Sequence, residues 1–156
     1  MSGISLKRYR GDQHSEFVDA LDEATRTHHA VDVFLLAHTN SFVDWVAELP
    51  ADLRFMYNTG CRNVSQGPRW LALGAKSYVG HPGVSASPVF YYFMLRRWSG
   101  GQSLEQSVAD SWRNTRTALI QTAPLYERFR SLNAVLAETE PHCSGAQFIH
   151  IGEATR

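Results

Sequence analysis

The stretch VDVFLLA at residues 31–37 decides the fold class, together with LRFMY at 53–57 and KSYV at 76–79. The first two stretches are almost continuously apolar, which is typical of strands that are covered on both faces of a sheet. Segments with helical patterns separate the three stretches, and strands that alternate with helices form a largely parallel sheet. We therefore expect an α/β fold, a three-layer α/β/α sandwich with a mostly parallel central sheet.

Several helices can be placed from periodicity and capping signals. In 12–27, the apolar residues Phe17 and Leu21 recur on one face. Ser87 as the N-cap and Pro88 at the first helical position predict a helix to about residue 98. It is apolar almost all round, so we expect it to be largely buried. Ser103 and Gln106 form a capping box for a helix to about residue 122. The remaining expected elements are strands at 4–9 and 146–151, the latter at an edge, a short helix or turn at 42–49, and helices at 68–73 and 125–137.

Length and composition restrict the class of protein. The 156 residues predict a single domain over 1–156. Lys+Arg and Asp+Glu both number 15, and a zero net charge argues against a dedicated nucleic-acid-binding protein. The chain has neither an apolar run near the ~20 residues of a membrane helix nor a secretory signal at its N-terminus. Two distant cysteines are no disulfide framework, so we expect a cytoplasmic protein with reduced thiols.

Three chemically active side chains follow the expected strands. His38 comes directly after 31–37, Cys61 follows 53–57 and the turn NTG, and His81 follows the third strand. Because the carboxyl ends of parallel strands open at one edge of the sheet, we expect these groups to lie there together. A thiol with a neighbouring imidazole is the arrangement of nucleophilic catalysis. Gly60 permits a close approach of backbone to a carbonyl, and nearby N–H groups can form an oxyanion hole.

Structural explanations stand beside this hypothesis. Cysteine is among the most buried residue types and often serves as a small core side chain. A histidine at a strand end is often a surface or capping residue, and His81 before Pro82-Gly83 is most simply a turn residue. No glycine-rich phosphate loop is present and the remaining His and Cys residues lack metal-ligand spacing, so we expect neither cofactor nor metal.

The order of these segments resembles a known family. FVDALDEATRTHHAVDVFLLAH at 17–38, followed by LRFMYNTGC at 53–61, is similar to the core of the caspase-like cysteine peptidase fold of clan CD, nearest to bacterial CHAT domains. In that family a helix precedes an apolar strand ending in the catalytic His, and a later strand ends in the catalytic Cys. Residues 70–113 resemble the family's following helix, strand, variable loop and two helices. The similarity covers roughly residues 4–116.

The resemblance implies a Cys-His dyad and a thioester acyl-enzyme. Cys61 would be the nucleophile and His38 the base. Around them the resemblance places the oxyanion-hole donors Thr39, Gly60 and Cys61 and the substrate-binding residues Arg62, Asn63, His81 and Ser85.

Three departures from the family leave other functions open. Thr39 replaces the usual Gly after the His, the loop from His38 to Leu53 is short, and the family's first strand and helix have no counterpart. An uncovered sheet edge would then favour a homodimer. We expect a hydrolase of peptide or protein substrates, a peptidase or amidase, with neither nucleic acid nor membrane as a partner. The alternatives are an inactive caspase-like scaffold or partner-binding domain, and a Cys-dependent acyltransferase or cyclase.

Overall fold

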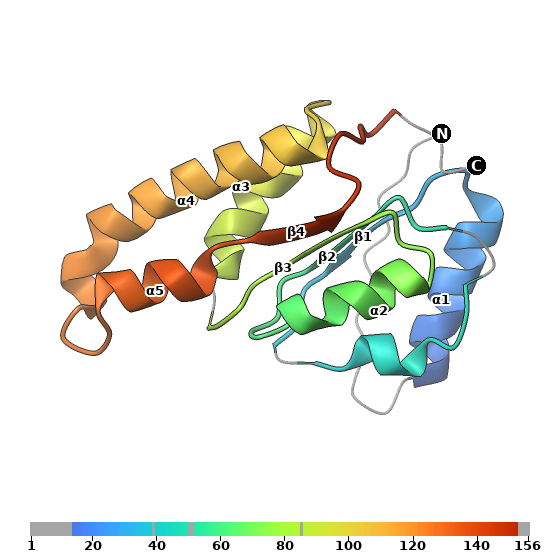
Figure 1. Cartoon of the computed structure of the whole chain (residues 1–156), viewed down its shortest axis with the longest axis horizontal. Coiled ribbons are helices and arrows are strands. Elements are labelled where there is room, and N and C mark those ends of the chain that lie inside the picture. The colour runs from blue at the N-terminus through green and yellow to red at the C-terminus, as the bar shows by residue number, and fades with distance from the viewer. Residues whose placement is uncertain (1–13, 39, 50–51, 85, 153–156) are drawn as a thin grey trace.

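A four-stranded sheet organises the chain (Figure 1). The computed structural model describes residues 14–38, 40–49, 52–84 and 86–152. The strands follow the order β1 (Asp32–Leu35), β2 (Phe55–Asn58), β3 (Ser77–Gly80) and β4 (His142–Gly145). The first three are parallel, and β4 runs antiparallel to β3. The predicted α/β class and mostly parallel sheet are confirmed.

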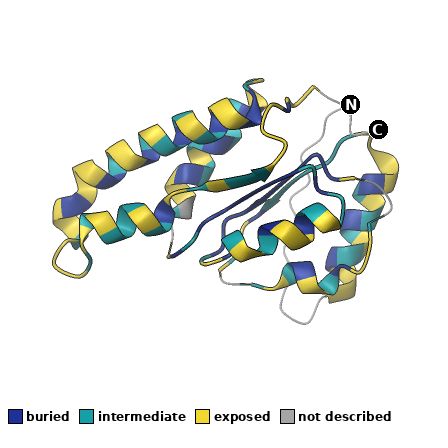
Figure 2. Ribbon diagram, in the orientation of Figure 1, coloured by how far each residue is buried: buried dark blue, intermediate teal, exposed yellow. Residues whose placement is uncertain are grey.

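Two apolar clusters cover opposite faces of the sheet. Side chains alternate along a strand, so Met56 of β2 faces one side while Phe55 and Tyr57 face the other. The helices α1 (His14–Thr27) and α2 (Gly67–Ala72) pack on the Met56 side, and α3 (Ser87–Ser99) packs on the other (Figure 1). Because both faces are covered, every residue of β2 and β3 is buried (Figure 2).

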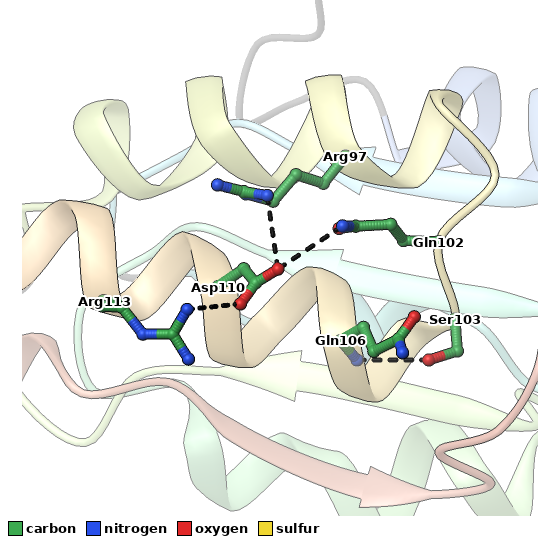
Figure 3. A network of polar contacts seen from close by, with 6 residues as sticks. All are labelled: Arg97, Gln102, Ser103, Gln106, Asp110 and Arg113. Atoms are coloured by element: carbon green, nitrogen blue, oxygen red, sulfur yellow. Dashed lines mark hydrogen bonds and ion pairs between the residues drawn. The ribbon is translucent and has the colours of Figure 1, made fainter.

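The C-terminal half adds two helices, α4 (Leu104–Tyr126) and α5 (Leu132–Thr139). Ser103 caps α4, since its Oγ accepts from the N–H of Gln106 at 3.2 Å. A polar network joins α3 to α4 (Figure 3): the Asp110 carboxylate accepts from Arg97 at 3.3 Å and from Arg113 at 2.8 Å. Among the helices of the described residues, none has the length and apolarity to cross a membrane.

A buried ion pair lies at the end of the sheet where the parallel strands β1 and β2 begin. Arg54 binds both carboxylate oxygens of Asp32, at 2.8 and 2.6 Å, and its side chain is only 7% exposed. The indole N–H of Trp98 donates to the same carboxylate at 2.8 Å, and the Arg54 guanidinium lies 5.6 Å from the Trp98 ring centroid. These contacts tie β1, the start of β2 and α3 together.

Two predictions at the C-terminus are wrong. The last strand is not 146–151 but β4, and the later segment instead caps α4, since the carbonyls of Ile149 and Gln147 accept from the N–H groups of Leu104 and Glu105. The first turn of a helix leaves such donors unsatisfied, which explains the use of this segment. The chain also does not change helix at 122–125; α4 continues to Tyr126, and α5 begins after the Ser131 cap.

The third helix is only partly buried, contrary to expectation. Phe90, Met94 and Trp98 of α3 reach the core, but Tyr92 is 58% exposed because it lies on the outer face of the helix. The N-cap is Ala86 rather than Ser87. The extended segment predicted at 4–9 lies outside the described residues. Short 3-10 helices, η1 (Phe42–Trp45) and η2 (Val64–Gln66), complete the described elements.

Candidate functional site at the carboxyl edge of the sheet

The register of β1 and β2 places the segments of His38 and Cys61 next to each other. Leu35 pairs with Asn58 in the parallel ladder, and His38 and Cys61 each follow these partners by three residues. Beyond the ladder, the N–H and the hydroxyl of Thr59 both donate to the Leu35 carbonyl, at 2.9 and 3.1 Å. The two chain segments therefore leave the sheet side by side.

The loop that carries His38 lies close against Gly60. A Cβ at this position would lie 2.5 Å from the His38 carbonyl oxygen and 2.7 Å from Nδ2 of Asn40. No larger residue fits without displacing the loop that carries His38. The prediction that Gly60 lets backbone come close to a substrate carbonyl stays a prediction; the carbonyl that lies against Gly60 in the structure is that of His38.

Cys61 lies in a turn that is held on both sides. The thiol is half-buried and takes part in no disulfide. The next residue, Arg62, has the left-handed φ of 57°, and its N–H donates to the Gly83 carbonyl at 3.0 Å. Asn63 is fully buried; its Nδ2 donates to the Asn58 carbonyl at 2.7 Å, and its Oδ1 accepts from the His81 N–H at 2.9 Å. Asn63 is thus a structural residue of the turn and not open to a substrate.

His38 is exposed, and its ring forms no hydrogen bond within the part of the chain that the structure describes. Its backbone is fixed, since the carbonyl accepts from Nδ2 of Asn40 at 2.8 Å. The structure therefore brings the backbones of the His38 and Cys61 segments together without a bond between imidazole and thiol. Catalytic hydrogen bonds are often long before a substrate binds.

The predicted oxyanion hole loses one of its three expected donors, the N–H of Gly60. The N–H of Gly60 donates to Oδ1 of Asn58 at 3.1 Å, so the expectation that it is an available donor is wrong. A side-chain oxygen two residues earlier forms this bond as part of the turn. Thr39 and Ser85 lie outside the described residues, and the role of the Cys61 N–H stays a prediction.

His81 is fully buried, which contradicts the prediction that it binds a substrate. Its Nδ1 lies 2.6 Å from the Thr139 carbonyl, which can only accept, so Nδ1 carries the proton. Nε2 then accepts from the Tyr57 hydroxyl at 3.0 Å. Burial lowers the pKa of His81 to about 4; the charge of His142 acts in the same direction, while the Thr139 bond opposes it. His81 joins β2, β3 and α5 as a neutral ring and is not available to a substrate.

A network of carboxamides at this edge was not predicted. Asn58 is the last residue of β2, and its fully buried side chain contacts Asn40 and Gln66. A polar residue that ends an otherwise apolar strand, as in FMYN, is a signal that could have pointed to Asn58. Nothing in the sequence pattern indicates its partners, because they lie 18 residues before it and eight after it.

Other groups do not add to this site. Burial raises the pKa of Cys143 to about 11, with a further contribution from Glu105, so this thiol on β4 is a poor nucleophile. The described residues contain no group of three or more His, Cys, Asp or Glu side chains that could hold a metal. An open hollow of about 360 Å³ lies at the joint of α3 and α4; its lining residues are Phe93, Arg96, Arg97, Gly100, Gln102 and Asn114.

No protein-family model, curated protein or solved structure matches this chain. Proposals on its function therefore depend on the carboxyl edge of the sheet and on the sequence pattern.

Proposed function

We propose that this chain is a caspase-like cysteine hydrolase, a peptidase or an amidase, in which Cys61 is the nucleophile and His38 the base. In this proposal the sheet and its helices are a minimal three-layer caspase-like sandwich, nearest to the CHAT domains. The substrate is a peptide or protein, and a reduced thiol suits a cytoplasmic location.

The observation that carries the proposal is the register of β1 and β2. Leu35 of β1 pairs with Asn58 of β2, and His38 and Cys61 follow these two residues by the same number of positions along the chain. The same order, a helix, a strand followed by His and a strand followed by Cys, is the pattern by which the sequence resembles the caspase-like family. Cys61 is half-buried at this edge, and the backbone segment that carries the exposed His38 lies beside it.

The chemistry follows from these two groups. His38 takes the proton of Cys61, and the thiolate attacks the carbonyl carbon of the substrate. The tetrahedral intermediate collapses to a thioester as the amine leaves with the proton from His38. His38 then deprotonates a water, which attacks the thioester; the acid leaves and the thiol recovers its proton. Backbone N–H groups near the thiol are the expected donors to the oxyanion.

A second candidate is an inactive caspase-like domain that binds a partner protein. The ring of His38 without a hydrogen bond among the described residues favours it, as does Thr39 in place of the family's Gly. A Cys-dependent acyltransferase or cyclase would use the same dyad with an amine or carbon nucleophile in place of water.

The test is the rate of Cys61 alkylation by iodoacetamide as a function of pH. It uses Cys143→Ser as background, with and without His38→Ala, and with His28→Ala, an exposed histidine, as the matched control. A rate midpoint well below the ordinary thiol value of about 8.5 that moves only with His38→Ala supports the dyad. A midpoint indifferent to His38 would exclude it and favour the partner-binding domain.

Substrate trials then separate the reactions that a working dyad permits. Peptide and ester libraries are incubated with the Cys143→Ser protein, and Cys61→Ala is the inactive control. Release of free acid supports hydrolysis. Transfer of the acyl group to an added amine, with little free acid, would instead assign an acyltransferase.

A further inference from the structure

We propose that Asn40 and Asn58 are positioning residues that hold the His38 loop against the Cys61 turn. This inference deepens the proposed function and rests on it. It gives a role to two carboxamides that form no hydrogen bond with the Cys61 thiol or the His38 ring but connect the segments that carry them.

The two side chains form a reciprocal pair. Nδ2 of Asn40 donates to Oδ1 of Asn58 at 3.1 Å, and Nδ2 of Asn58 donates to Oδ1 of Asn40 at 3.2 Å. Each then reaches one arm of the site: Asn40 Nδ2 donates to the His38 carbonyl at 2.8 Å, and Asn58 Oδ1 accepts from the Gly60 N–H at 3.1 Å. The pair thus spans from the residue before Cys61 to the backbone of His38.

Gln66 supports the pair from outside. Its Oε1 accepts from Nδ2 of Asn58 at 3.1 Å, and its Nε2 donates to the Asn40 carbonyl at 2.5 Å. A carboxamide offers two donor hydrogens and two acceptor lone pairs, so the amide of Asn58 makes all the bonds it can. Because Asn58 is buried, any other arrangement of its amide leaves a buried polar group unpaired, and this favours the one arrangement observed.

The loop needs such support because the sheet no longer supplies it. The β1–β2 ladder ends at Leu35 and Asn58, and Thr59 is the last residue whose N–H reaches β1. His38 itself is exposed, and its described backbone contact is the bond from Asn40. A dyad requires the imidazole within reach of the thiol, and small displacements cost much of the rate. The neutral amides also add no charge that would compete with the thiolate.

The experiment measures Cys61 alkylation against pH in the Cys143→Ser background. Asn40→Ala is the main variant, because Asn40 lies in a half-exposed loop and its loss is compatible with folding. Asn58→Ala removes the other half of the pair. The matched control is Asn133→Ala, an exposed asparagine of α5. Thermal unfolding of every variant separates a loss of fold from a loss of position.

The expected result is a shift of the rate midpoint toward the ordinary thiol value in Asn40→Ala. At a pH well below both midpoints, a shift of one unit lowers the thiolate fraction about tenfold, so the variants are compared there. Adding His38→Ala to Asn40→Ala should change the midpoint little further, because both variants remove the same contact between imidazole and thiol. Asn133→Ala should leave the midpoint unchanged.

Two results would overturn the inference, and they differ. If His38→Ala moves the midpoint while Asn40→Ala and Asn58→Ala only lower the melting temperature, the dyad stands and the pair is merely structural. If His38→Ala itself leaves the midpoint unchanged, the proposed function fails, and with it the positioning role.

Discussion

Acidification is expected to destabilise this fold through one side chain, His81. The ring is fully buried between Tyr57 and Thr139, and its pKa is lowered from 6.5 to about 4. The folded state therefore binds a proton less readily than the unfolded chain. The contribution of neutral His81 to stability is complete above about pH 6.5 and is lost as the pH falls toward 4.

The size of the effect follows from the separation of the two pKa values. At about 1.36 kcal/mol per unit, protonation of His81 costs about 3 kcal/mol of unfolding free energy by pH 4. Folded domains of this kind have a total stability of about 5–15 kcal/mol, so the loss is a large part of it. The source is the burial of a charge that neither the Tyr57 hydroxyl nor the Thr139 carbonyl neutralises.

The assay is urea unfolding followed by tryptophan fluorescence, since Trp70 and Trp98 are fully buried. His81→Asn retains a neutral donor for the Thr139 carbonyl and cannot titrate. The wild type should lose about 3 kcal/mol more than this variant between about pH 7.5 and 4. His28→Asn, an exposed control, should follow the wild type. Parallel losses in wild type and His81→Asn would refute the reasoning.

Three further substitutions test other contacts. Asp32→Ala leaves the buried Arg54 without its carboxylate and should cost about 3 kcal/mol in urea unfolding; a loss under about 1 kcal/mol would contradict this. Arg62→Gly removes a side chain from a left-handed φ and should raise stability by about 1 kcal/mol, whereas Arg62→Ala should not. Gly60→Ala pushes Cβ against the His38 carbonyl and should cost about 1–3 kcal/mol; an unchanged urea midpoint would show that the loop yields freely.

A prediction on assembly concerns the β1 edge of the sheet. In the described part of the chain, β1 pairs on one side only, with β2. We expect a homodimer through this edge, which light scattering would detect as about twice the chain mass of 17.5 kDa. A monomer mass over the accessible concentrations would contradict it.

The central strands could be predicted because their composition leaves few alternatives. Both β2 and β3 are buried along their whole length, and such strands are mostly apolar on both faces, with polar residues only at their ends. The prediction of a strand at 146–151 was wrong because AQFIHI has strand-like composition, whereas carbonyls of this segment cap α4. That role depends on where the N-terminus of α4 lies in space, which local sequence does not contain.

At the site, the chain segments that meet could be predicted from the sequence, but the burial and bonding of each side chain could not. Cys61 and the backbone of His38 lie at one edge, as expected from parallel strands. His81 occupies the same edge in sequence but turns inward, because α5 supplies a carbonyl, 58 residues away, that its ring can bind. The Asn40–Asn58 pair was equally invisible, since carboxamides of a loop and a strand end carry no spacing rule.

At the carboxyl edge, the residues that satisfy the end of the backbone ladder are also those that would position a catalytic thiol. Where the ladder ends, backbone donors and acceptors lose their partners, and buried ones must be satisfied by side chains. Asn58 and Asn63 do this at the end of β2, and both are inaccessible to solvent. A catalytic thiol at this edge would gain its fixed position from the same bonds. Stability and Cys61 reactivity must therefore be measured on the same variants, because only a change in reactivity at nearly constant stability identifies a positioning role.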